Sequence, residues 1–145
     1  MTIWYAWIDS QGLVRGNGMI QDAMVSYIIA PSGMTRLNVS EARYQDMKLM
    51  PEGWKVNGAG TDIVRKATVP VTVDKTTITA NGIDAFTISN IPNPSEVAVT
   101  GSGAPNAYVT VTDGQAIITS EDPGHIQVSI RSVGYSDWKG DFDAV

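Results

Sequence analysis

The chain has 145 residues, 43% of them hydrophobic and 17% charged, and its formal net charge is −5. This composition is typical of one ordinary globular domain or two small ones and excludes a disordered tail. The absence of cysteine excludes a disulfide framework, a thiolate zinc site and a cysteine nucleophile. No apolar run is long enough for a membrane span and no signal-peptide pattern is present. We therefore expect no membrane insertion, and a chain that leaves the cytoplasm only within a larger assembly.

Charge, methionine and tryptophan are distributed unevenly along the chain. Residues 1–66 have a net charge of +1 and contain all six methionines and three of the four tryptophans, whereas residues 67–145 have a net charge of −6. We place a domain boundary between these parts, at residues 65–70, because Pro70 suits a linker or the first residue of a strand. Binding to a phosphate backbone needs clustered Lys and Arg, so nucleic acid is not expected as a partner of the acidic second part.

The first part opens with an aromatic strand signal. Ile3–Ile8 is rich in strand-forming side chains and is followed by a turn at Asp9–Gly12, with Leu13-Val14 as a short return strand of a hairpin. Gly16-Asn17-Gly18 is interpreted as a further turn. The apolar run Ser26–Ala30, stopped by a Pro-Ser-Gly segment, predicts a second strand.

A helix is predicted next. Asn38 is the expected N-cap, because Glu41 follows it at capping-box spacing and apolar residues at roughly helical spacing continue to Met50. Pro51–Gly53 ends this segment. The helical period is imperfect, which leaves a strand over residues 47–50 as the alternative. The short elements expected after it are strands at 54–56 and 61–64 and a turn at Gly58–Gly60.

The second part is a run of short alternating segments closed by turn signals at Asn81-Gly82, Asp113-Gly114 and Pro123-Gly124. Strict alternation places every second side chain on one face of a sheet. Many short strands without a crossover helix predict an antiparallel sandwich. The strands we expect are 71–73, 76–79, 85–88, 97–100, 108–112, 116–119, 126–130 and one near Trp138.

Specific segments of the second part carry a family resemblance. The resemblance rests on four segments: the threonine-rich entry Thr76–Asp84, the strand through Phe86 and Ile88, the Pro-Gly turn that leads into His125–Ile130, and the later Gly134-Tyr135 pair. In these segments the chain resembles a bacterial immunoglobulin-like domain of the kind often appended to tailed-phage virion proteins. It departs from the commoner versions at residues 101–105.

The first part is similar, through Ile3–Asp9 and Gly12, to the small β-rich N-terminal parts of phage tail or tail-fibre accessory proteins. The fold class implied is mainly β. A β-rich docking domain with one short helix (1–66) precedes an immunoglobulin-like antiparallel β-sandwich (67–145).

Two groups of side chains in the second part invite a chemical interpretation. His125 is the only histidine, yet no Gly-x-Ser-x-Gly elbow accompanies it, so we interpret it as a strand-face residue. Asp137, Asp141 and Asp143 offer oxygens for calcium, but the EF-hand series is absent. A solvated acidic edge that discourages strand pairing is the favoured interpretation.

The first part contains three carboxylates, Glu41, Asp46 and Glu52, that would be the general acid and base of a small carbohydrate hydrolase. No substrate-binding aromatic pattern accompanies them, and surface solubility is the simpler role. The Gly-x-Gly segments at residues 16–18 and 58–60 are not followed by the lysine of a phosphate-binding loop, so we do not interpret them as nucleotide sites. We therefore predict no catalytic residue, no cofactor and no metal site.

Trp4, Tyr5 and Trp7 are the residues we single out as a partner interface. In a strand, Trp4 shares a face with Ala6 and Ile8, while Tyr5 and Trp7 point the opposite way. If one face is core, the other exposes large aromatics, and Tyr and Trp are enriched in binding hot spots. The alternative is that other elements of the protein cover both faces.

These observations favour a non-enzymatic structural protein of a phage virion, attached to the tail, baseplate or fibre. We expect other virion proteins as partners, several symmetric copies, and a host-surface glycan as a further candidate ligand of the immunoglobulin-like module. Capsid decoration and a cytoplasmic tail-fibre assembly factor are the alternatives.

Overall fold

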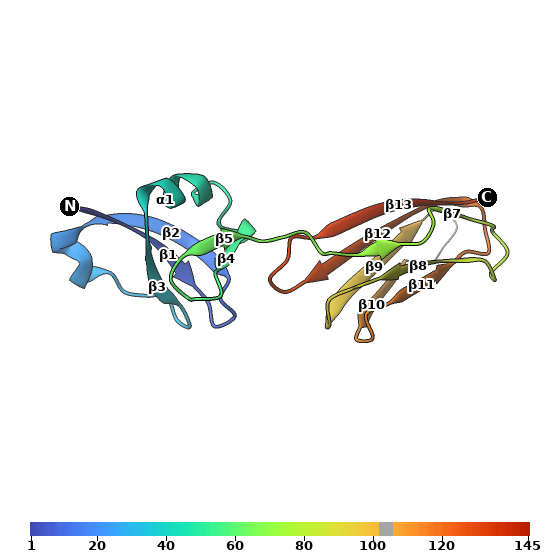
Figure 1. Cartoon of the computed structure of the whole chain (residues 1–145), viewed down its shortest axis with the longest axis horizontal. Coiled ribbons are helices and arrows are strands. Elements are labelled where there is room, and N and C mark those ends of the chain that lie inside the picture. The colour runs from blue at the N-terminus through green and yellow to red at the C-terminus, as the bar shows by residue number, and fades with distance from the viewer. Residues whose placement is uncertain (102–105) are drawn as a thin grey trace. The chain divides into compact units, whose positions relative to one another are not determined.

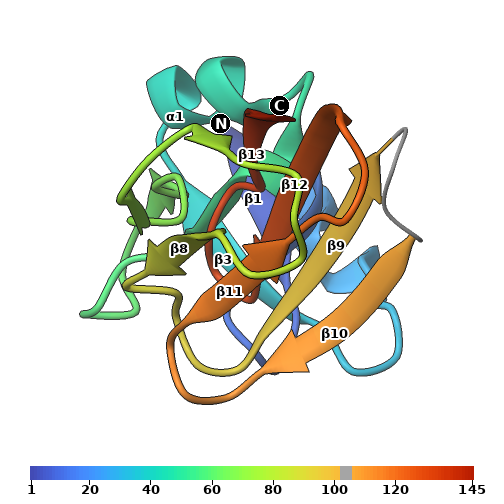
Figure 2. The same ribbon diagram turned by 90° about the vertical axis from the view of Figure 1, so that its right-hand side faces the viewer.

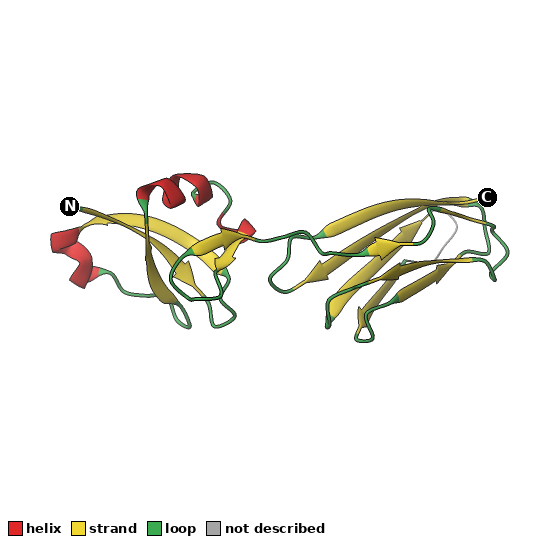
Figure 3. Ribbon diagram, viewed as in Figure 1, coloured by secondary structure: helices red, strands yellow, loops and turns green. Residues whose placement is uncertain are grey.

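The computed structural model of the chain describes residues 1–101 and 106–145. The chain forms two compact units, Met1–Lys66 and Ala67–Val145, each with its own hydrophobic core (Figure 1). Strands predominate in both, and within the described residues the helical segments lie in the first unit (Figure 3). None of these helices is long and apolar enough to cross a membrane.

The first unit is built on an antiparallel sheet of three strands in the order β2-β1-β3. The central strand β1 (Thr2–Ile8) pairs on one side with β2 (Val14–Gln21) and on the other with β3 (Thr35–Val39). The predicted hairpin of residues 3–14 is confirmed, and its return strand is longer than expected. The remaining elements are the 3-10 helix η1 (Asp22–Tyr27), α1 (Glu41–Met47), the 3-10 turn η2 (Pro51–Gly53), β4 (Trp54–Val56) and β5 (Ile63–Arg65).

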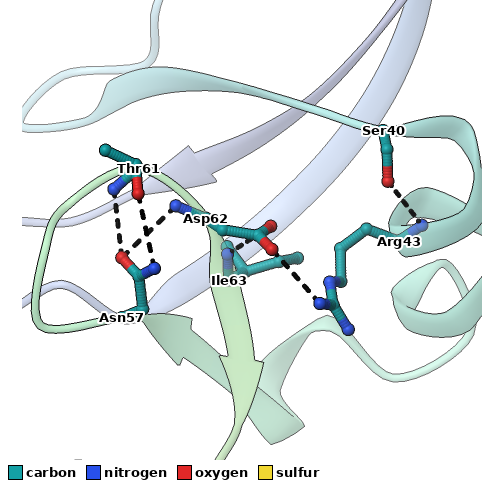
Figure 4. A network of polar contacts seen from close by, with 6 residues as sticks. All are labelled: Ser40, Arg43, Asn57, Thr61, Asp62 and Ile63. Carbon is teal, nitrogen blue, oxygen red and sulfur yellow. Dashed lines mark hydrogen bonds and ion pairs between the residues drawn. The ribbon is translucent and has the colours of Figure 1, made fainter.

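Polar contacts fix α1 to the β4–β5 hairpin (Figure 4). Ser40 caps the helix by accepting a hydrogen bond from the Arg43 amide at 3.2 Å. The Arg43 guanidinium donates to Asp62 at 3.1 Å. The Asn57 side chain in turn accepts from the amides of Thr61 and Asp62 at 3.0 and 3.3 Å. The hairpin turn, the strand after it and the helix are thereby held in one arrangement.

Trp54 fills the centre of the first unit and is 3% exposed. The guanidinium groups of Arg43 and Arg65 lie over its ring, 5.6 and 5.2 Å from the ring centroid. Cation–π attraction of this kind contributes about 0.5–2 kcal/mol for each cation, depending on how far the pair is removed from water. Residues packed with it in this core are Ala6, Ile8, Val14, Met47 and Ile63.

Three sequence predictions for the first unit are wrong. Gly16-Asn17-Gly18 is not a turn, because it lies inside β2 and pairs with β1. Ser26–Ala30 is not a strand, because η1 and an irregular segment occupy it. The helix is present, but its N-cap is Ser40, since Asn38 belongs to β3. Met47 is the last residue of the helix, which excludes the alternative strand over 47–50.

The second unit is a sandwich of two sheets. One sheet has the strand order β10-β9-β12-β13-β7 and the other β11-β8-β6. The pairing is antiparallel except between β13 and β7, which are parallel. The strands are β6 (Thr72–Val73), β7 (Thr77–Ile78), β8 (Ala85–Ser89), β9 (Ser95–Gly101), β10 (Ala107–Val111), β11 (Ala116–Thr119), β12 (Gly124–Ser132) and β13 (Trp138–Ala144).

All eight predicted strands of this unit are confirmed in position. The order places consecutive β9 and β10 beside β12 and β13, with β8 and β11 in the facing sheet, which is the arrangement of an immunoglobulin-like sandwich. The mainly β fold class is therefore confirmed. Phe86 and Phe142 stack across the two sheets, with ring centroids 3.9 Å apart and planes 6° apart. Residues 102–105, where the sequence departs from the commoner domains, lie outside the described residues.

Candidate functional site: an aromatic sheet face

The central strand β1 presents different side chains to the two faces of its sheet. Ala6 and Ile8 are 0% and 8% exposed and belong to the core. Trp4, on the same face, packs against Tyr44 of α1, with ring centroids 4.8 Å apart. This face is therefore occupied by the unit's own helix, and Trp4 is a packing residue.

Tyr5 and Trp7 extend from the opposite face of the same sheet and are half-buried. Their rings meet edge to face at 5.2 Å and an interplanar angle of 69°, a geometry that aromatic pairs prefer. The two rings therefore support each other on the outer face. Of the three residues predicted as an interface, the structure brings these two together and directs the third into the fold.

Two glycines of β2 make room for the aromatic rings. Tyr5 pairs with Gly18 and Trp7 with Gly16 in the antiparallel register. A Cβ atom at Gly18 would lie only 2.6 Å from Cζ of Tyr5, so any larger residue there displaces that ring. A Cβ atom at Gly16 would meet Cδ1 of Trp7 at 3.4 Å, an ordinary contact distance. The Tyr5 ring therefore lies directly over the β2 backbone.

Strand β3 supplies the polar side of this face. Arg36 pairs with Trp7 and Asn38 with Tyr5, and directly paired residues share a face. A shallow groove of about 340 Å³ runs beside Trp7 and Arg36 and is lined on its far side by Val25, Ser26, Ile28 and Ala30. We name Tyr5, Trp7, Gly16, Gly18, Arg36 and Asn38 the aromatic face. Segment 25–30 borders this face and leaves its two rings partly exposed.

The glycines and Arg36 were missed by the sequence interpretation, although a signal exists. The aromatics at positions 5 and 7 and the glycines at 16 and 18 have the same spacing of two. In an antiparallel hairpin this spacing places glycine opposite aromatic, where the ring covers the exposed backbone.

The second unit assembles His125 with two predicted acidic residues. Pairing of β12 with β13 brings the histidine between Asp141 and Asp143, and each ring nitrogen is 3.2 Å from a carboxylate oxygen. Hydrogen bonding to Asp143 and then to Asp141 raises the pKa of His125 above 6.5. Asp137 lies apart, 3.4 Å from Arg131. Among the described residues, no group of three or more His, Asp or Glu side chains is arranged to hold a metal ion.

The three carboxylates of the first unit are not brought into one site. Glu41 is in the first turn of α1, where the helix dipole favours a negative charge. Asp46 follows five residues later, about 140° around the helix. Glu52 lies in η2. The carboxylate that pairs with Arg43 is Asp62, which the sequence interpretation did not single out.

Comparison with protein-family models gives no match, and comparison with curated proteins gives none either. Among solved structures, the chain is similar to the C-terminal 282-residue fragment of intimin, crystallised in complex with the intimin-binding domain of the translocated intimin receptor. The identity is 28%, the match covers 51% of this chain and 31% of the intimin fragment, and the TM-score is 0.37. The match thus spans about a third of that fragment.

Proposed function

We propose that the protein is a non-enzymatic structural component of a phage virion, attached to the tail, baseplate or fibre. In this proposal the first unit docks on a virion protein through its aromatic face, and the immunoglobulin-like unit is a spacer or an outward-facing adhesion module. The observation that carries the docking role is the partly exposed Tyr5–Trp7 pair, held over two glycines beside Arg36. The virion setting is supported by the sequence resemblance.

Energetic considerations favour this face as a docking surface. Tyr, Trp and Arg are the residues most enriched in binding hot spots, and each hot-spot residue contributes about 2 kcal/mol or more. The rings of Tyr5 and Trp7 are held in contact on a paired strand, so ordering them on binding costs little side-chain entropy. Several copies in a symmetric particle would multiply a modest affinity through avidity.

The second unit suits a role without chemistry of its own. It holds most of the chain's negative charge, and Asp141 and Asp143 line one strand beside His125. Strand β13 lies between β12 and β7, so these exposed carboxylates charge the solvent face of a paired strand and do not form the free acidic edge that the sequence suggested. An adhesion role would direct this unit toward the host surface, where a protein or a glycan is the candidate ligand.

The test is to locate the full chain in purified virions. We expect mass spectrometry of gradient-purified particles to detect the protein and electron cryomicroscopy to place symmetric copies on the tail or fibre attachment. Density on the head lattice would assign capsid decoration. Absence from particles, together with co-purification with a fibre protein from lysate, would assign the assembly-factor alternative and contradict the proposal.

Matched variants test the docking face in the same particles. Trp7→Ala and Tyr5→Ala should each reduce incorporation, because a loss of about 2 kcal/mol weakens binding about thirtyfold. The control is Ile83→Ala, which removes an 86% exposed apolar side chain from the second unit. Equal incorporation of all three variants would exclude the aromatic face as the docking surface.

A further inference from the structure

The connection between β2 and β3 has to cross the central strand of the first sheet. Gln21 at the end of β2 pairs with Thr2, and Thr35 at the start of β3 pairs with Ile8. The connection therefore passes from one end of β1 to the other. It also passes from one side of β1 to the other, because the strand order is β2-β1-β3. We name this connection, residues 22–34, the strap (Figure 1 and Figure 2).

The groove beside Trp7 shows which face of the sheet the strap crosses. Trp7 and Arg36 line this groove of about 340 Å³ from the sheet. Val25 and Ile28 line it from the strap. Because Trp7 and Arg36 are directly paired residues of the aromatic face, the strap crosses on the aromatic side of the sheet, opposite the side that α1 covers. The groove is the space left between the strap and the Trp7 side chain.

Few interactions hold the strap in its place. None of its residues is buried. Among the described residues, no backbone hydrogen bond joins residues 23–33 to the rest of the unit. The bonds from Ile28 to Val25 and from Met34 to Pro31 stay within the strap. A segment with few buried apolar contacts and only local hydrogen bonds opens at a low cost in free energy, so the strap is free to move while the sheet stays intact.

The strap is also longer than its path requires. The path measures about 20 Å along the seven residues of β1 and about 10 Å across two strand spacings. An extended chain of about seven residues would span this distance. The strap has about twice as many residues, and part of the surplus is wound into η1. This surplus lets the strap move toward the sheet or away from it without disturbing β2 and β3.

The apolar side chains of the strap are divided between its two sides. Val25 and Ile28 line the groove and are half-buried. Tyr27 and Ile29 do not line it and are 74% and 89% exposed. Movement of the strap toward Trp7 would close the groove and bury Val25 and Ile28 against the indole. Burial of apolar surface favours this movement, and the entropy lost by immobilising the strap opposes it.

We propose that the strap is an autoinhibitory cover that closes onto the aromatic face and competes there with a docking partner. The structure shows the open position, in which Tyr5 and Trp7 are partly exposed. In the closed position Ile28 packs on Trp7, and a partner has to displace the strap before it reaches the two rings. The apparent affinity for the partner then falls in proportion to the open fraction. This inference rests on the proposed docking role of the aromatic face and adds its regulation.

Two matched pairs of variants of the full chain shift this balance in opposite directions. Ser26→Leu adds an apolar side chain to the groove and should favour closure, whereas Ser32→Leu makes the same change at a position of the strap outside the groove. Ile28→Ser removes an apolar side chain from the groove and should favour opening. Its control is Ile29→Ser, which makes the same change on the exposed side of the strap. Both controls should behave like the wild-type protein.

Closure is measured in the free chain by fluorine NMR after 5-fluorotryptophan labelling. Loss of a resonance in Trp7→Phe assigns the signal of Trp7, and its shift difference between H₂O and D₂O reports the exposure of the ring. We expect Ser26→Leu to lower this difference and Ile28→Ser to raise it. Closure should also raise the order parameters of the strap amides in Ser26→Leu. Equal Trp7 exposure and equal strap order in the wild-type protein and all four variants would overturn the proposal.

Incorporation into purified particles at limiting protein concentration tests the competition. If Ser26→Leu lowers the open fraction from about one half to about one tenth, incorporation should fall about fivefold, and Ile28→Ser can raise it at most about twofold. Changes of the opposite sign would show that the strap contacts the partner directly and would refute the cover.

Trp7→Ala separates the two levels of the argument. If it lowers incorporation while the strap variants leave incorporation unchanged, the docking role stands and the cover is refuted. If Trp7→Ala leaves incorporation unchanged, the docking role itself is refuted, and the competition with it.

Discussion

Because the ring of Tyr5 lies over Gly18, we expect Gly18→Ala to destabilise the wild-type protein and to stabilise a variant that lacks this ring. In the wild-type protein, Gly18→Ala places a methyl group 2.6 Å from Cζ of Tyr5, so the ring must move and loses its edge contact with Trp7. Overpacking typically costs about 1–3 kcal/mol, and replacing glycine within a strand recovers about 0.5–1 kcal/mol. The ring is half-exposed and free to swing outward, so we expect a net destabilisation of about 1 kcal/mol.

In a Tyr5→Ala background the same substitution should stabilise the protein. The clash is removed with the ring, and only the gain of about 0.5–1 kcal/mol from replacing glycine remains. The coupling energy between the two positions is then about 1.5–2 kcal/mol, well above the scatter expected for independent sites. Gly16→Ala is the matched control: its methyl group meets Trp7 at 3.4 Å without a clash, so it should stabilise the protein by about 0.5–1 kcal/mol whether or not the Tyr5 ring is present.

Thermal unfolding of the full chain, followed by tryptophan fluorescence, measures the stability of the wild-type protein, the two single variants and the double variant, and so gives the coupling energy. Three of the four tryptophans are in residues 1–66, so the signal reports mainly on the first unit, and its transition is fitted separately from that of the second. A change of 1 kcal/mol shifts the midpoint of a domain of this size by about 4–8 °C. The reasoning is refuted if Gly18→Ala shifts the midpoint in the same direction in both backgrounds.

Two further predictions concern the second unit. Phe86→Ala removes a fully buried ring that stacks on Phe142 at 3.9 Å, so the free energy of unfolding measured with denaturant should fall by about 3–5 kcal/mol; a loss below about 1.5 kcal/mol would contradict the central role of this pair. The raised pKa of His125 means that its contribution to stability is fully present below pH 6.5 and is lost as pH rises through the folded-state pKa. In an NMR titration of this single histidine, Asp143→Asn should lower the pKa more than Asp141→Asn, and an unchanged pKa in both variants would exclude the carboxylates as its cause.

The sandwich was predictable because its signals are local. Phe86 and Ile88 are fully buried while Thr87 between them is not, so the alternation is visible within one strand. Several strands also end near a residue with positive φ, such as Gly82 after β7 or Gly114 after β10. Where a strand and its turn are both encoded by neighbouring residues, the sequence alone suffices to locate them.

The errors in the first unit arise where distant residues decide the structure. Gly16 and Gly18 have the local pattern of a turn, but their role as strand residues is set by the aromatic side chains of β1. Residues 26–30 form an apolar run, yet Tyr27 and Ile29 are 74% and 89% exposed, and among the described residues no strand pairs with this segment. Composition cannot reveal whether a partner strand is present.

The candidate interface was predictable in part. Alternation separates Trp4 from Tyr5 and Trp7, but it does not reveal which side becomes the core. Packing of α1 decides this, because Tyr44 of the helix covers Trp4.

The parallel pairing of β7 with β13 has a mechanical consequence. Backbone hydrogen bonds join the segment around β7 to the end of β13, from the amide of Asp143 to Thr76 at 3.0 Å, from Val145 to Ile78 at 2.9 Å and from Ala80 to Val145 at 2.8 Å. A tension that pulls back on the segment before β7 and forward on the residue after β13 slides the two strands along each other. All three bonds then resist together, whereas an antiparallel hairpin pulled at its open end would unzip bond by bond. The pairing of β7 with β13 therefore resists tension along the strands more strongly than tension that peels the strands apart.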